Sequence, residues 1–149
     1  MDELRELYQE AIVDHSASPR NFGALAGATH EAEGYNPMCG DHYRVYVQLA
    51  GDRIEAVRFE GEGCAISKAS GSMMSGAVRG KTRQEVQALF EGFRGIVTGQ
   101  SAAHDPSLGK LLAFAGVSEF PMRVKCATLA WHTLLAALAG QPEATSTES

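Results

Sequence analysis

The sequence has no excess of basic residues, no long hydrophobic run and few cysteines. Its 149 residues include 13 Lys and Arg against 18 Asp and Glu, which gives a net charge of −5. A protein that binds the phosphates of nucleic acid carries clustered basic residues, whereas this sequence has a pI near 5.5. We therefore expect no nucleic-acid partner.

The most apolar stretch, residues 129–139, is too short to cross a bilayer. It falls well short of the roughly 20 apolar residues that a span requires, and it contains Trp131, His132 and Thr133. The N-terminus alternates charges and lacks the basic and then apolar order of a secretory signal. These absences predict a protein without a membrane partner that stays in the cytoplasm.

Two alternating segments predict a β-hairpin. Apolar residues occupy every second position over residues 43–49 and again at Val57 and Phe59, with a turn at residues 50–52 between the runs. The alternation slips at Ile54, which predicts a bulge. A weaker pattern over residues 29–35 predicts a third strand.

Helical spacing dominates the rest of the chain. It predicts helices from Leu4 to near Asp14, over residues 65–77, after a Thr82–Glu85 capping box, from Asp105-Pro106 to Gly116, and from Pro121 to Gly140. Strands followed by helices predict an α+β fold, a small three-stranded antiparallel sheet with helices packed on one face. We expect a single domain over residues 1–140 and a disordered, solvated tail over residues 141–149, which has almost no apolar content.

The three cysteines are an odd number and do not suggest a disulfide framework. Cys39 and Asp41 flank Gly40 just before the first hairpin strand, and Cys64 follows the second strand. Because the start of one antiparallel strand adjoins the end of the next, these two segments are expected to be neighbours. Metal or thiol chemistry is therefore the first hypothesis for this end of the hairpin.

Cys126, on the last predicted helix, completes the set if that helix packs against the same end of the hairpin. Three thiolates and one carboxylate suit tetrahedral zinc, although thiolates also accept Cu(I) or an iron–sulfur cluster. Arg123 and Lys125 would offset the excess negative charge of such a site. None of the five histidines has a spacing that singles it out as a ligand.

Three separated motifs carry a family resemblance. Residues 36–41, 61–67 and 123–127 resemble the IscU-like superfamily of iron–sulfur cluster assembly proteins, in its SufU branch, and the similarity extends from about Leu4 to Gly140. Two features favour the SufU branch. Lys125 stands where scaffold-type IscU proteins have a histidine, and a segment around residues 97–106 is absent from those proteins.

The resemblance implies an IscU/SufU-like fold and a zinc-dependent sulfurtransferase. In such a protein Cys39, Asp41, Cys64 and Cys126 correspond to the zinc ligands, and Cys39 is the catalytic residue that receives persulfide sulfur. The implied partners are a pyridoxal-phosphate-dependent, SufS-like cysteine desulfurase and downstream iron–sulfur assembly proteins. Two alternatives stay open: a scaffold that builds a [2Fe–2S] cluster and delivers it to apo-proteins, and a structural zinc module that docks partners.

Overall fold

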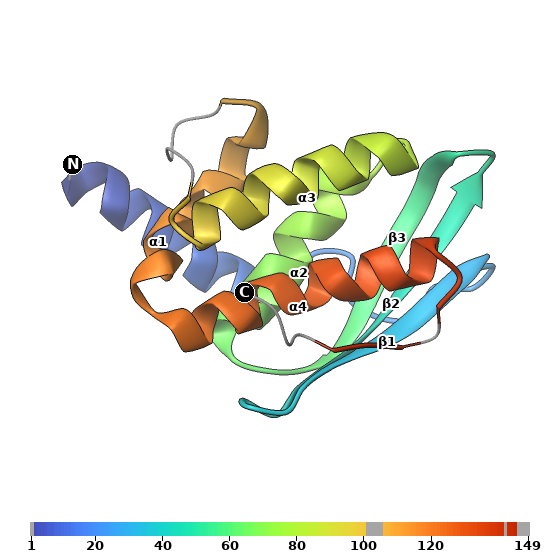
Figure 1. Ribbon diagram of the computed structural model, residues 1–149, viewed down its shortest axis with the longest axis horizontal. Coiled ribbons are helices and arrows are strands. Elements are labelled where there is room, and N and C mark those ends of the chain that lie inside the picture. The colour runs from blue at the N-terminus through green and yellow to red at the C-terminus, as the bar shows by residue number, and fades with distance from the viewer. Residues whose placement is uncertain (1, 101–105, 142, 146–149) are drawn as a thin grey trace.

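A twisted antiparallel sheet forms one side of the computed structural model, which describes residues 2–100, 106–141 and 143–145 (Figure 1). Its main strands are β1 (His30–Asn36), β2 (Asp41–Ala50) and β3 (Arg53–Glu62), paired in the order β3-β2-β1. Both pairings are antiparallel. The predicted three-stranded sheet is thus confirmed, including the strand with the weakest sequence pattern.

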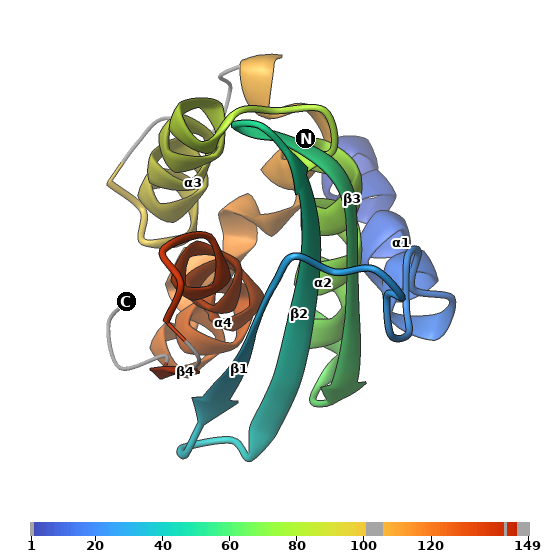
Figure 2. The same ribbon diagram turned by 90° about the vertical axis from the view of Figure 1, so that its right-hand side faces the viewer.

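One face of the sheet is buried under helices. Tyr43, Val45 and Val47 of β2 are buried, whereas His42 on the opposite face is exposed. Helices α2 (Ala65–Val78) and α4 (Pro121–Leu138) contact the strands on the buried side (Figures 1 and 2). This arrangement confirms the predicted α+β architecture. Among the described helices, none combines the length and the apolar character needed to cross a membrane.

Local signals in the sequence locate the hairpin irregularity and a helix start correctly. Gln48 pairs with Ala56 but Leu49 pairs with Ile54, so β3 has one extra residue and a bulge. Helix α3 (Arg83–Val97) begins after Thr82, whose side chain accepts the Glu85 N–H while the Glu85 side chain accepts the Thr82 N–H. The predicted capping box is therefore present.

Two helical segments differ from the sequence prediction. Helix α1 (Asp2–Ala17) continues past Asp14, because the first residue that opposes a helix is Pro19, which disfavours helical backbone at the residue before it. The segment η1 (Pro106–Glu119) is a 3₁₀ helix interrupted at Gly109, whose φ of +53° is left-handed. Asp105, the predicted cap of this segment, lies outside the described residues.

The end of the chain adds a short strand to the sheet. Strand β4 (Glu143–Thr145) pairs in parallel with β1 and is the fourth strand of the sheet, in the order β3-β2-β1-β4. We expected a solvated tail over residues 141–149, so these three residues differ from that expectation. Residues 142 and 146–149 lie outside the described residues.

Serines of α2 hold the loop that follows α1. Ser72 Oγ accepts the backbone N–H of Arg20 at 2.8 Å and lies 2.7 Å from Nδ1 of His15. Ser75 Oγ accepts a hydrogen bond from the Asn21 side chain at 2.9 Å. These contacts attach α1 and its loop to α2, on the far side of the molecule from β1 and β4 (Figure 2).

Helix α4 approaches β1 closely at Gly34. A Cβ atom at Gly34 would lie 1.8 Å from Oγ1 of Thr133, which is buried and donates a hydrogen bond to the Leu129 carbonyl at 2.7 Å. Behind this contact the Trp131 ring of α4 stacks on Phe93 of α3, with ring centroids 5.1 Å apart. The helix is therefore held between the sheet and α3.

Replacing Gly34 with alanine is expected to destabilise the protein by about 1–3 kcal/mol, because the added methyl overlaps a side chain that cannot rotate away freely. Gly76→Ala is the matched control, since a Cβ at Gly76 in α2 meets nothing within 4 Å and should stabilise the helix by about 0.5–1 kcal/mol. Urea unfolding monitored by circular dichroism measures both. Equal stability of Gly34→Ala and the parent would contradict the close approach.

Candidate metal centre

Cys39 lies on a tight turn between β1 and β2 that is organised by Asn36. The Asn36 side-chain oxygen accepts the Met38 N–H at 3.1 Å, and its backbone oxygen accepts the N–H groups of Cys39 at 3.3 Å and Gly40 at 2.8 Å. Gly40 adopts a φ of +76°, a left-handed conformation that glycine tolerates best. The turn leaves Cys39 exposed at the surface.

Asp41 is the first residue of β2 and is buried, with 1% of its surface exposed. Its Oδ1 accepts the backbone N–H of Cys64 at 3.0 Å. Its Oδ2 is also buried and has no hydrogen-bond partner among the described residues. Because a buried polar atom without a partner is costly, this oxygen is available for another ligand.

Cys64 occupies the N-cap position of α2, makes no side-chain capping hydrogen bond and is half-buried. The Ser67 hydroxyl donates to the Cys64 carbonyl at 3.0 Å and lies 2.8 Å from the buried hydroxyl of Tyr43. The hydrogen bond between Cys64 and Asp41 joins this cap to the start of β2. The predicted adjacency of the two hairpin ends is confirmed by this bond and by the pairing of His42 with Glu62.

Cys126, on the second turn of α4, reaches the same place and is buried. Its Sγ lies 3.4 Å from Sγ of Cys39 and accepts a hydrogen bond from the side-chain Nδ2 of Asn36 at 3.9 Å. Ligand atoms of Cys39, Asp41 and Cys126 all lie within 4.8 Å of one another. Cys64 is not a member of this close group.

The pKa values of the Cys64 and Cys126 thiols shift in opposite directions. Interaction with the Cys126 thiol, together with a backbone hydrogen bond at Ser67, lowers the pKa of Cys64 to about 5 against the opposing effect of burial. The hydrogen bond with Cys64 is the largest cause that raises the pKa of Cys126, and burial of the Cys126 thiol raises it further. In the metal-free protein Cys64 is therefore the thiolate and Cys126 keeps its proton at neutral pH.

The donor set fits a divalent cation that prefers sulfur. Two thiolates on one tetrahedral zinc lie about 3.8 Å apart, since each Zn–S bond is about 2.3 Å. The 3.4 Å between the sulfurs of Cys39 and Cys126 is close to that value. The unpartnered oxygen of Asp41 supplies a third donor, and the Cys64 thiolate next to it would supply a fourth.

The remaining predicted residues and some unpredicted ones surround this group. Arg123, exposed, and Lys125, half-buried, lie on the first turns of α4, and their effect on the charge of the site stays a prediction. The sequence analysis assigned no role to Asn36, Tyr43 or Ser67. An asparagine two residues before a backbone N–H in a turn is a known local signal, and it would have identified Asn36.

Comparison with known proteins places this geometry in a family. Residues 7–139 match the model described as the NifU-like N-terminal domain. The chain belongs to this family. The family is part of the IscU/SufU superfamily, so the resemblance found in the sequence motifs is confirmed.

Relatives in this family carry names from two branches. The SufU protein of Bacillus subtilis (strain 168), named a zinc-dependent sulfurtransferase, is 42% identical over 131 residues, which cover 88% of each chain. The Streptococcus pyogenes serotype M1 protein named iron–sulfur cluster assembly scaffold protein IscU is 41% identical over 93% of this chain and 86% of its own. The chain is almost equally similar to proteins that bear the two names, so these identities do not decide between the IscU and SufU branches.

A solved structure shows the same fold. The protein from Fervidobacterium islandicum AW-1, which has been proposed as an iron–sulfur cluster assembly scaffold for the SUF system, is 38% identical. It superposes with a TM-score of 0.82 and covers 90% of this chain and 98% of its own. The architecture built from β1–β3, α2 and α4 is therefore the family fold.

The low pKa of Cys64 has a measurable consequence in metal-free protein. Thiolate reacts with iodoacetamide and thiol does not, so alkylation of Cys64 should already be fast at pH 6 and fall only as the pH drops through about 5. Peptide mass spectrometry after short pulses from pH 4 to 9 measures it, with glutathione as the ordinary thiol. A midpoint for Cys64 equal to that of glutathione would contradict the assignment.

Proposed function

We propose that this protein is a zinc-dependent sulfur acceptor that takes persulfide sulfur from a cysteine desulfurase for iron–sulfur cluster assembly. One observation carries the proposal. Three ligand atoms from β1–β2 and α4 converge, and of these three residues only Cys39 is exposed while Asp41 and Cys126 are buried. Such a group combines a protected binding site with one sulfur that a partner can reach.

In this proposal Cys39, Asp41, Cys64 and Cys126 hold zinc. When bound, zinc supplies a redox-inert charge that keeps the thiolates deprotonated at neutral pH. Asp41 already directs one oxygen to the Cys64 N–H, and this bond would orient the other oxygen toward the donor group. Arg123 and Lys125 would lower the negative charge of three thiolates and a carboxylate around one dication.

The chemistry assigned to Cys39 is thiolate exchange. The Cys39 thiolate attacks the outer sulfur of a persulfide on the desulfurase, forms a new S–S bond and displaces the desulfurase thiolate. The sulfur is transferred without an external oxidant, since one sulfur–sulfur bond forms as another breaks. Cys39 then carries the persulfide on an exposed turn from which a later acceptor can take it.

Exposed apolar side chains on the two segments that form the site support docking of a protein partner. Tyr35 and Met38 come from the end of β1 and its turn, and Phe120 and Met122 from the start of α4. Each side chain is between 48% and 61% exposed. Large apolar residues grouped on a surface mark interaction sites more often than isolated ones do.

The proposal predicts that Cys39→Ala abolishes sulfur acceptance. Zinc-loaded protein is mixed with a SufS-like cysteine desulfurase and L-cysteine; alanine formation gives the turnover, and peptide mass spectrometry locates the added sulfur. We expect one sulfur on Cys39 in the parent and none in the variant, with alanine formation falling to that of the desulfurase alone. Met38→Ala, which removes an exposed neighbour but no donor, should still accept sulfur. Parent-like acceleration by Cys39→Ala would refute the proposal.

The second candidate is a scaffold on which a [2Fe–2S] cluster is assembled. Three thiolates and a carboxylate are also an acceptable ligand set for iron, and the Streptococcus relative bears a scaffold name at 41% identity. Lys125 argues against it by resemblance, because scaffold-type IscU proteins have a histidine there. The two candidates differ in which metal the donors retain.

Anaerobic reconstitution separates these candidates. Zinc-loaded protein is incubated with ferrous iron, sulfide and reductant, and then analysed for metal content and visible absorption. Sulfur transfer predicts that zinc is retained at about one ion per chain without cluster absorption. A stable cluster that passes intact to an apo-ferredoxin would favour the scaffold. An Asp41→Ala variant is the control, because loss of one donor should release zinc in either case.

A further inference from the structure

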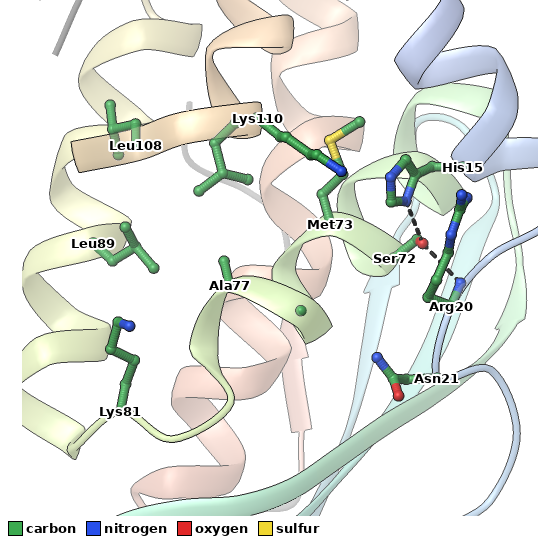
Figure 3. A pocket seen from close by; sticks show the side chains of 12 residues that line it. His15, Arg20, Asn21, Ser72, Met73, Ala77, Lys81, Leu89, Leu108 and Lys110 are labelled. Carbon is green, nitrogen blue, oxygen red and sulfur yellow. Dashed lines mark hydrogen bonds between the residues drawn. The ribbon is translucent and has the colours of Figure 1, made fainter. Parts of the chain in front are cut away.

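A cavity lies away from the metal centre, beside the C-terminal half of α2. It has a volume of about 460 Å³ and lies among the end of α1, α2, α3 and η1 (Figure 3). Five apolar side chains form much of its lining: Met73, Ala77, Leu89, Leu108 and Leu111. Volumes of about 300–1,000 Å³ are typical of small-molecule sites.

The charged residues of this cavity are all basic. Arg20, Lys81 and Lys110 line it, and its lining contains no carboxylate. Arg20 is paired with Asp14 at 2.6 Å, but neither lysine ammonium forms an ion pair within the described part of the chain. Two lysines without an ion pair therefore lie beside the apolar lining of this cavity.

Polar neutral groups complete the wall between these cations. His15 contacts Ser72 through Nδ1 at 2.7 Å, which fixes the ring and leaves its other nitrogen available. Burial is the largest cause that lowers the pKa of His15. The positive charges of Arg20 and Lys110 lower it further. The imidazole is therefore neutral near pH 7 and the positive charge of the cavity comes from Arg20 and the lysines.

The basic and apolar residues of the lining together suit a molecule that has both an anionic head and an apolar chain. Figure 3 shows the Lys110 side chain extending over Met73 toward His15, with Lys81 on the other side of Ala77. A bare inorganic anion would leave the leucines and Met73 uncovered, and a neutral hydrocarbon would leave the ammonium groups without a partner. Ser72 lies eight residues along α2 from Cys64, so neither the ligands nor the transfer chemistry proposed above uses this cavity.

We infer that this cavity binds a small organic anion, a carboxylate or phosphate monoester attached to an apolar chain, whose head lies between Lys110 and His15 and whose chain covers Met73, Ala77 and Leu89 in the direction of Lys81. The inference does not depend on the proposed sulfur transfer, since it concerns different residues and a different ligand.

Isothermal titration calorimetry on the zinc-loaded full chain tests the inference with matched probes below their micelle concentrations. Octanoate and octyl phosphate are expected to bind one per chain. Octanol, octyltrimethylammonium and inorganic phosphate, which lack either the charge or the chain, should bind at least about tenfold more weakly. The ratio of octanoate to octyl phosphate affinity distinguishes a carboxylate site from a phosphate site, and either result supports the inference.

Charge variants identify the site. Lys110→Gln should weaken octanoate or octyl phosphate binding by about fivefold, the size expected for a partly exposed ion pair, and Lys81→Gln, at the other end of the cavity, should weaken it less. Arg79→Gln is the matched control, because Arg79 is exposed, ends α2 and does not line the cavity. Ligand should also shift the His15 ring signals in NMR spectra more than those of the other histidines.

Three results would overturn the inference. They are absence of saturable binding by either anionic probe, equal binding of octanol, or equal affinity of Lys110→Gln and Arg79→Gln. None of these results bears on sulfur acceptance by Cys39, so failure here and failure of the proposed function are separately recognised.

Discussion

The contact between Gly34 of β1 and Thr133 of α4 is the constraint on which the metal centre depends. Because Gly34 has no side chain, the helix lies directly against the strand. Asn36 is two residues further along β1, and Cys126 is about two turns earlier on α4. The close approach therefore brings the buried thiol of Cys126 to the β1–β2 turn and within 3.4 Å of Cys39.

Because Asp41 and Cys126 are buried, the stability of this donor group depends on whether it holds a proton or a metal ion. Thiolate and carboxylate charges within 4.8 Å of one another repel strongly where water is excluded. In the metal-free protein Cys126 keeps its proton and interacts with the Cys64 thiolate, which is why the pKa of Cys64 is lowered and the pKa of Cys126 is raised. Binding a dication would displace that proton, so metal affinity should rise with pH. The backbone bonds from Asn36 and to Asp41 keep the donors in position in either state.

Local patterns in the sequence predict what short-range chemistry determines. Alternation gives the hairpin, the slip at Ile54 gives its bulge, and antiparallel register places Asp41 beside Cys64. Cys39 and Asp41 converge through a turn in which Gly40 is left-handed. The serines of α2 pack the α1 loop by hydrogen bonds that no local pattern reveals.

Contacts between distant segments are beyond such patterns. Nothing in residues 121–138 alone shows that α4 presents Cys126 to the hairpin, since this depends on the missing side chain at Gly34 and on Trp131 stacking against Phe93. The family motifs supply that information only by resemblance. The kink at Gly109 and the pairing of β4 with β1 also depend on tertiary context.

The unequal exposure of the donors is the strongest physical reason to prefer transfer over storage. A donor set that stores a metal or cluster gains from burying every ligand equally, because an exposed thiolate is open to exchange and oxidation. Here Asp41 and Cys126 are buried in strand and helix, whereas Cys39 lies on an exposed turn that hydrogen bonds to Asn36 hold in place. Cys39 can leave the group by a change in that turn, while the other donors keep their places. An acceptor needs this asymmetry, since the sulfur that reacts must be released without dismantling the site that protects it.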